Sequence, residues 1–389
     1  MKTSGFKSAT ERYEAWLGDH LNIVEGHLEH KYQKMRDQGV FTFLRGTYYR
    51  WAELWDSERK ALLRSGLLSS GAPPVFAIGD LHLENFGTWR DREGRLIWGI
   101  NDFDEAYPLD YTNDLVRLAT SALLARKHSS LRWGFSHKTL CRELLAGYEE
   151  GLRNGGHAFV LKHDILWLWK IATHPSRSPE VFWEKLYSRR HKRISKPLRK
   201  LAKEAEAAIS RCLPFSDNFN DRSLRPRQAG VGSLGRPRFI QFFEGRNGQF
   251  LREAKAVIPS AAVFVGLGKP IRKPYRKVLE GAVRVRDPFY RVRRGWLVRR
   301  LAFDTNKIEL QSLSTINAFR DYFHAMGAET ANIHLGSKNS KKVVKHLSAQ
   351  NKRKPAWLYE ASLRMVKLTQ HDFLEFQATD LGRNGDTGR

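Results

Sequence analysis

Apolar residues recur at helical spacing in several long segments of the chain. Residues 11–35 are charged but carry apolar side chains three and four positions apart, which predicts a helix. The same spacing predicts an amphipathic helix over 111–128, "YTNDLVRLATSALLARKH". We expect mostly helical structure over 138–212, and again from residue 312 onward through "INAFRDYFHAMGAETANIH".

Two other regions carry short apolar runs bounded by turn residues, which is the pattern of strands. In the first, the strands "PVFAIGD" (74–80) and "LIWGINDFDEA" (96–106) flank the loop "LHLENFGTWRDREGR", in which "RDREGR" suits a hairpin connection. The second begins near Leu213, where glycine, proline and asparagine become frequent, and includes the Asn-Gly turn of "RNGQ" (246–249).

These patterns predict an α+β protein in three parts. A helical larger lobe covers residues 1–212 and contains the first pair of strands. A β-rich small lobe covers 213–303, and residues 304–389 return to the helical lobe.

The charge of the chain is strongly positive. Lys and Arg number 67 against 41 Asp and Glu, a formal net charge of +26, which favours contact with polyanions such as nucleic acid. Cys141 and Cys212 are too few for a disulfide framework or a zinc cluster, and no apolar run is long enough to span a bilayer. We therefore expect a soluble protein of the cytoplasm.

A dense group of polar residues follows the first predicted strand, in "GDLHLENFG". We call residues 79–85 the polar loop. In phosphoryl transfer, one Asp orients the nucleophile, while an Asn oxygen and a second Asp hold Mg²⁺ against the nucleotide phosphates. Asp80 and Asn85 have the spacing of the first two, and Asp102 or Asp104 in "NDFDE" would be the second metal ligand. His82 is expected to hydrogen-bond and to shape the loop at the catalytic position.

Simpler and rival interpretations of the same residues exist. Asp80 and Asn85 could merely cap a turn, but four carboxylates following two neighbouring strands favour a functional site. A metallophosphoesterase would need further Asn and His ligands after later strands, and "NGGH" at Asn154 and "ANIH" at Asn332 lie in helical or polar contexts. A sugar-nucleotide transferase would use "DFD" as its metal motif and leave the polar loop unexplained.

A second motif, "GVGSLG", places glycines in the spacing G-x-G-x-x-G. We call residues 230–235 the glycine loop. A dinucleotide site would need a helix directly after it, whereas this loop precedes a predicted hairpin of strands. A glycine loop between strands, with a Lys on the next strand, is how kinases cover nucleotide phosphates. The residues predicted to bind the nucleotide are therefore Gly230, Gly232, Ser233, Gly235 and Lys255, with Glu280 as the ion-pair partner of the lysine.

The alternative for this motif is a glycine-rich turn beside an ordinary surface lysine. The order of the motifs also departs from a kinase, in which the glycine loop precedes the catalytic loop. If both motifs are functional, the chain is circularly permuted, which packed lobes tolerate. Permutation predicts that the helix of "AMGAETANIH" runs toward the polar loop and ends near His334.

Six stretches together resemble an uncharacterised bacterial family, domain of unknown function 2252: "FTFLRGT", "IGDLHLENFG", "INDFDEAYPLDYTNDLVRLATS", "GVGSLG", "LREAKA" and "MGAETANIH". Locally, "GDLHLEN" followed by "NDFD" is also similar to the catalytic segment of aminoglycoside phosphotransferases. That likeness implies that Asp80 is the catalytic base, that Asn85 and Asp102 bind magnesium, and that Asp114 anchors the loop. Arg45 in "FLRGT" is either a phosphate contact or a buried structural arginine.

The sequence therefore predicts a circularly permuted, two-lobed, protein-kinase-like protein that transfers phosphate from ATP, with Mg²⁺, to an unidentified hydroxyl-bearing acceptor. One alternative is a basic nucleic-acid-binding protein that uses residues 189–203, "RRHKRISKPLRKLAK", as its phosphate-contacting face. Another is a pseudokinase that binds nucleotide without catalysis.

Overall fold

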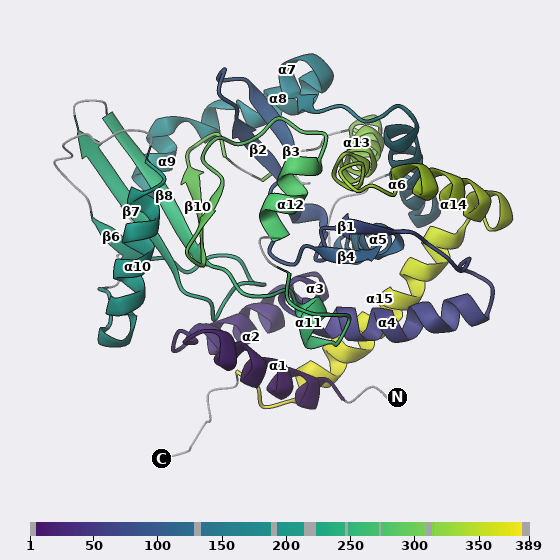
Figure 1. Cartoon of the computed structure of the whole chain (residues 1–389), viewed down its shortest axis with the longest axis horizontal. Helices are drawn as coiled ribbons and strands as arrows, with labels where there is room; N and C mark the ends of the chain where they lie inside the picture. Colours follow the sequence, from purple (N-terminus) through teal and green to yellow (C-terminus); the bar gives the residue numbers. More distant parts are fainter. Residues whose placement is uncertain are drawn as a thin grey trace.

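The computed structural model describes residues 5–127, 134–187, 193–213, 223–245, 248–271, 274–305, 307, 308, 313 and 315–382. Within them the fold is mixed α+β, as predicted, with helices and several small sheets (Figure 1). No helix among these residues is long and apolar enough to cross a membrane.

The N-terminal helices pack against the last helix of the chain. The amide of Phe6 donates to Glu375, and the rings of Phe6, Phe43 and Phe376 share a small core. Arg50 donates two hydrogen bonds to the carboxylate of Asp372, both buried. The elements joined in this way are α1 (Phe6–His20), α2 (His27–Gln38), α3 (Val40–Gly46), α4 (Tyr48–Arg64) and α15 (Trp357–Ala378).

The largest hydrophobic core extends from the N-terminal helices and α15 into the helices between them. Two of them, α6 (His137–Arg153) and α13 (Ile316–His334), cross so closely that glycine is required at the contact. A Cβ on Gly147 would lie 1.9 Å from the backbone oxygen of His324, and one on Gly327 would lie 2.0 Å from that of Leu144. The helices α5 (Thr112–Lys127) and α14 (Ser340–Arg353) pack beside this pair.

Two small antiparallel sheets carry the polar loop and the segment of "NDFDE". One pairs β1 (Pro74–Ala77) with β4 (Tyr107–Asp110), and the other has the order β2-β3-β5. The predicted connection "RDREGR" does join a hairpin, but Phe86–Arg90, predicted as loop, forms a strand. The remaining elements here are η1 (Leu83–Asn85), β2 (Phe86–Arg90), β3 (Leu96–Ile100) and β5 (Phe159–Val160).

A separate five-stranded antiparallel sheet has the order β6-β7-β8-β10-β9. The glycine loop connects β6 to β7, so the predicted succession of strand, glycine loop and strand is confirmed. Residues 246 and 247 of the predicted Asn-Gly turn lie outside the described residues, although Gly245 pairs with Gly248. The strands are β6 (Leu224–Pro226), β7 (Arg238–Gly245), β8 (Gly248–Ala256), β9 (Arg291–Arg293) and β10 (Trp296–Leu301).

Helix α10 covers one face of this sheet through small side chains such as Ala205 and Ala208. Its first turn lies in the basic stretch 189–203, of which residues 189–192 are outside the described part of the chain. The other elements are α7 (Leu161–Asp164), α8 (Leu166–Ala172), η2 (Pro175–Arg177), α9 (Pro179–Tyr187), η3 (Lys196–Leu198), α10 (Arg199–Ser210), α11 (Ala261–Phe264) and α12 (Pro274–Gly281).

The helix predicted over residues 11–35 is two helices, α1 and α2, in the structure. The break falls at Gly26, whose φ of 71° is left-handed and is tolerated because glycine has no Cβ. The aromatic stretch that follows is also helical and forms α3 and α4.

Candidate functional site

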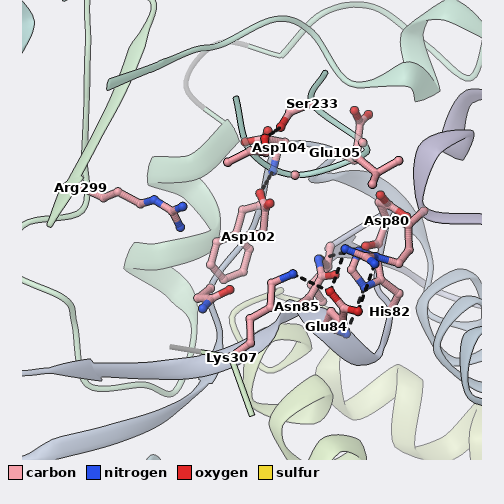
Figure 2. Close-up of a pocket in the computed structure, with 18 of the residues that line it drawn as sticks. Asp80, His82, Glu84, Asn85, Asp102, Asp104, Glu105, Ser233, Arg299 and Lys307 are labelled. Atoms are coloured by element: carbon pink, nitrogen blue, oxygen red, sulfur yellow. Dashed lines mark hydrogen bonds and ion pairs between the residues drawn. The ribbon is translucent and has the colours of Figure 1, made fainter. Parts of the chain in front are cut away.

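The polar loop, the segment 102–105 ("DFDE") and the glycine loop line one cavity of about 400 Å³ (Figure 2). We call residues 102–105 the acidic segment. The cavity is also bordered by side chains of α3, α4 and β10. The structure thus brings most of the predicted site residues into one space: Asp80, His82, Asn85, Asp102, Asp104, Gly230, Gly232 and Ser233.

A buried network fixes the start of the polar loop. The carboxylate of Asp114, at the beginning of α5, accepts hydrogen bonds from the amides of Ile78 (2.6 Å) and Gly79 (2.9 Å). The same carboxylate contacts Nε2 of His334 at 2.9 Å, and His334 is the last residue of α13. The prediction that Asp114 anchors the loop is confirmed, and so is the prediction that this helix runs to the loop and ends at His334.

Asp80 lies beside a fully buried arginine. Its Oδ1 accepts hydrogen bonds from Nε (3.0 Å) and Nη2 (2.5 Å) of Arg117, whose side chain has no exposed surface. Burial raises the pKa of Asp80 to about 6, although the charge of Arg117 and its hydrogen bonds oppose this shift. A carboxyl group with this pKa is largely ionised at pH 7 and can still accept a proton, which suits a general base.

Asn85 presents an unsatisfied oxygen in the cavity wall. Its side-chain amide donates to the backbone oxygen of Asp80 at 3.0 Å, which leaves Oδ1 facing away from that bond. This oxygen is buried, and no described residue donates to it. Since an unpaired buried acceptor is costly, the arrangement suits a ligand that binds oxygen, such as a metal ion.

His82 shapes the loop in the way that the sequence predicts. Its Nδ1 accepts a hydrogen bond from the amide of Glu84 at 3.1 Å, so the proton of the neutral ring is on Nε2. Burial, together with the nearby charges of Arg45 and Arg117, lowers the pKa of His82 well below its usual value. The ring is therefore neutral at pH 7.

The two candidate aspartates of the acidic segment have different environments. Asp104 is almost buried: its carboxylate contacts Lys255 (2.5 Å) and Arg236 (3.3 Å) and accepts a hydrogen bond from the hydroxyl of Tyr275. Burial would raise the pKa of Asp104, but Lys255 and Arg236 outweigh it and lower the pKa below the ordinary value. Asp102 keeps 46% of its side chain exposed. It is thus the carboxylate available to a ligand, whereas Asp104 is already occupied.

The glycine loop lies against the polar loop. A Cβ on Gly232 would lie 2.9 Å from the backbone oxygen of Arg45, which is too close, and 3.8 Å from Oδ2 of Asp80, which is ordinary contact. Gly230 has a left-handed φ of 75° and lines the cavity with Ser233. Gly235 does not line the cavity, because its carbonyl accepts from Val24 and it packs on the turn between α1 and α2.

Lys255 lies on the third strand of the sheet in chain order, β8, and its Nζ is 3.5 Å from Oδ1 of Asp102. Lys255 is only 3% exposed and does not line the cavity. The predicted ion pair with Glu280 is wrong. Glu280 lies on α12 with its side chain 48% exposed, and it pairs with Arg276, one helical turn away.

Arg45 forms an ion pair and also lines the cavity, so both of its alternatives, a structural arginine and a phosphate contact, stay predictions. Its guanidinium forms an ion pair with Glu84 (2.8 Å), which also contacts Lys307 (2.6 Å). Burial would raise the pKa of Glu84, but these two cations lower it below its ordinary value. Glu84 therefore stays ionised and holds the side chains of Arg45 and Lys307 beside the polar loop.

Sequence reasoning missed the arginines around the glycine loop. Glu253 on β8 is completely buried and contacts Arg227 (2.7 Å), Arg238 (3.2 Å) and Arg299 (2.7 Å). These three cations lower the pKa of Glu253 well below its usual value, despite burial. The alternation of basic residues in "RPRQ" and "RPRF" is the signal that could have indicated a charged strand face, because residues two apart share a face.

The chain matches a protein family described as "Uncharacterized protein conserved in bacteria (DUF2252)", over residues 24–211 and 169–379. The two matched segments together cover most of the chain, which therefore belongs to this family. No curated protein and no solved structure matches it.

Proposed function

We propose that this protein is an ATP- and Mg²⁺-dependent phosphotransferase that acts on a hydroxyl-bearing acceptor. The observation that carries the proposal is the pair formed by the unsatisfied Oδ1 of Asn85 and the half-exposed carboxylate of Asp102 in one cavity. An amide oxygen and a carboxylate are ligands that Mg²⁺ takes when phosphate oxygens and water complete its shell.

Each further residue has a role in this scheme. Asp80 accepts the proton of the acceptor hydroxyl. At the same time, the hydroxyl oxygen bonds to the γ-phosphorus of ATP, and the bond from that phosphorus to the bridging oxygen breaks, which releases ADP. The backbone of Gly230, Gly232 and Ser233 lies where a polyphosphate could approach closely. Lys255 supplies positive charge next to the acidic segment. A bound Mg²⁺ would neutralise the charge that develops on the phosphate oxygens.

The proposed architecture is that of a circularly permuted kinase-like protein of two lobes. In its support, the sheet β6-β7-β8-β10-β9 carries the glycine loop and Lys255, whereas the polar loop and acidic segment come from the helical part. Helix α13, which follows the sheet in the chain, leads back to the polar loop through His334 and Asp114.

The direct test is Mg²⁺-dependent nucleotide binding, measured by titration calorimetry with ATP in Mg²⁺ or in EDTA. The wild type is expected to lose at least tenfold in affinity when Mg²⁺ is removed, and Asn85→Ala is expected to bind weakly in both conditions. Asn101→Ala is the matched control, since Asn101 also lines the cavity but has no assigned ligand role. Wild-type affinity that is the same with and without Mg²⁺ would contradict the proposal.

The net charge of +26 favours a second candidate, binding of a nucleic acid through the basic surface. In that case, affinity for a nucleic acid should fall steeply with added salt, and it should not respond to Asp102→Ala. Filter binding of RNA and DNA between about 50 and 200 mM salt separates the two candidates.

A further inference from the structure

A group of arginines lines the cavity apart from the residues assigned to phosphate transfer. It consists of Arg284, in the segment between α12 and β9, and of Arg299 and Arg300 on β10. We call these three residues the arginine wall. In Figure 2, Arg299 and Asp80 lie on opposite sides of Asp102, and the guanidinium of Arg299 is directed into the cavity.

Arg284 is held rigidly but is not satisfied. Its guanidinium lies over the ring of Trp89, 4.6 Å from the centroid, and over that of Phe103 at 5.1 Å. Its Nε and Nη1 are buried, and no described residue accepts a hydrogen bond from either. Burial lowers the pKa of Arg284, yet arginine stays protonated near neutral pH. A buried cation with two unused donors is suited to an anionic oxygen.

The other two arginines leave donors available as well. Arg300 donates only a long hydrogen bond, from Nη2 to the backbone oxygen of Arg90 at 3.4 Å, and its buried Nε has no partner among the described residues. Arg299 uses its Nε on Glu253. The side chain of Arg299 remains 28% exposed, and this part faces the cavity.

Among the acidic side chains of the described residues, Glu253 forms the ion pair with the arginine wall, through Arg299, and Arg284 and Arg300 have no such partner. Asp287 lines the same part of the cavity, but its Oδ1 accepts from the amide of Phe289, and no ion pair joins it to the arginine wall in the described residues. Burial raises the pKa of Asp287, although the charges of the three wall arginines oppose this shift. Glu329 affects Arg284 only at a distance, because its two oxygens accept from Ile100 and Asn332.

We propose that the arginine wall is a second anion-binding subsite, which takes a phosphate or carboxylate group of a small molecule other than the nucleotide triphosphate. The fork of an arginine matches the paired oxygens of both groups. The subsite does not depend on the proposed function. If that function is correct, the anion that binds the subsite belongs to the phosphate acceptor or to an effector, which is then an anionic small molecule.

The test is titration calorimetry with inorganic phosphate and, in a separate arm, with malonate as the carboxylate probe. The wild type is expected to bind at least one of these anions. Arg284→Gln and Arg300→Gln should each weaken that binding at least tenfold. The matched control is Arg286→Gln, which removes the same charge from an exposed residue two positions from Arg284 and should change affinity less than twofold.

Further arms separate this inference from the proposed function. Saturating Mg²⁺ and the non-hydrolysable analogue AMP-PNP should leave anion binding intact, and Asp102→Ala should weaken nucleotide binding without affecting the anion. The inference is overturned if the wild type binds neither anion, if Arg284→Gln and Arg300→Gln both bind as the wild type does, or if AMP-PNP displaces the anion. Because Arg284 packs against the rings of Trp89 and Phe103, its substitution can destabilise the fold, so the melting temperature of each variant is measured. Arg300→Gln tests the arginine wall without disturbing this packing.

Discussion

Two sides of the cavity, the polar loop (the first wall) and the glycine-loop side (the second wall), are held in place mainly by different interactions. The polar loop is fixed by hydrogen bonds to one buried carboxylate, that of Asp114, which also contacts His334 at the end of α13. The glycine-loop side is fixed by ion pairs, in which three arginines surround Glu253. The first wall presents the oxygens of Asp80 and Asn85, with Arg45 and Lys307 held beside them by Glu84, and the second presents guanidinium groups.

This difference teaches what the cavity can hold. Oxygen ligands on one wall attract a metal ion, and guanidinium groups on the other attract anionic oxygens. A metal-bound nucleotide would therefore use the first wall, and the arginine wall would remain available to a separate anion.

The largest expected effect is a loss of catalytic rate when the proposed base on the first wall is removed. Asp80→Asn removes the proposed base but keeps a hydrogen-bonding group beside Arg117. ATP hydrolysis, the transfer of phosphate to water, should fall about 10²- to 10⁴-fold. Steady-state phosphate release measures the rate, and circular dichroism checks the fold. A variant as active as the wild type would remove Asp80 from the catalytic role.

The next largest effect is a loss of stability when the ion pairs of the second wall are removed. Glu253→Gln leaves buried arginines without their shared counter-charge, so the free energy of unfolding should fall by about 3–5 kcal/mol. Urea denaturation measures this value. The control Glu280→Gln affects only the exposed pair with Arg276 and should cost less than about 1 kcal/mol. Similar costs for both variants would show that the network around Glu253 does not hold the wall.

A smaller effect concerns the anchor of the first wall. In Asp114→Asn, only one side-chain oxygen remains for the buried amides of Ile78 and Gly79. A buried donor without a partner costs about 1–3 kcal/mol, and urea denaturation should show a loss of this size. The rate of ATP hydrolysis should fall as well, because the loop that carries Asp80 loses its fixed position. An unchanged stability would mean that the amides find other partners.

The smallest effect is the pH dependence of the wild type. In the proposed mechanism, Asp80 must be ionised to act as the base. Its pKa is about 6, so the rate should rise with pH to a plateau near pH 7. Below pH 6 the rate should fall up to tenfold for each pH unit. A rate profile with its acidic midpoint near 4, the value of an ordinary carboxyl group, would contradict the role of this group.

The parts of the site that the sequence predicted are those set by local order along the chain. Asp80 and Asp102 lie just after the ends of β1 and β3, and Asn85 directly precedes β2. Because β2 pairs with β3, Asn85 and Asp102 meet without any knowledge of distant packing. The helix ending at His334 was predicted because the permutation requires a helix that returns to the polar loop.

The parts that could not be predicted depend on how distant elements pack. Glu280 lies on a helix whose orientation is set by tertiary contacts, and Lys255 instead contacts the acidic segment. Gly235 fits the glycine motif by spacing, yet it serves the turn between α1 and α2. Arginines in a basic chain are expected in solvent, so the burial of Arg284 between Trp89 and Phe103 leaves no local trace in the sequence.

The measurement that tests the central claim most directly is calorimetry of Mg-ATP binding to the wild type, Asp102→Ala and the control Glu280→Gln. The control removes an exposed carboxylate outside the cavity, and it should bind as the wild type does. The account predicts that the wild type binds Mg-ATP and that Asp102→Ala binds at least tenfold more weakly. Equal affinity of the wild type and Asp102→Ala, or no binding by either, would contradict it.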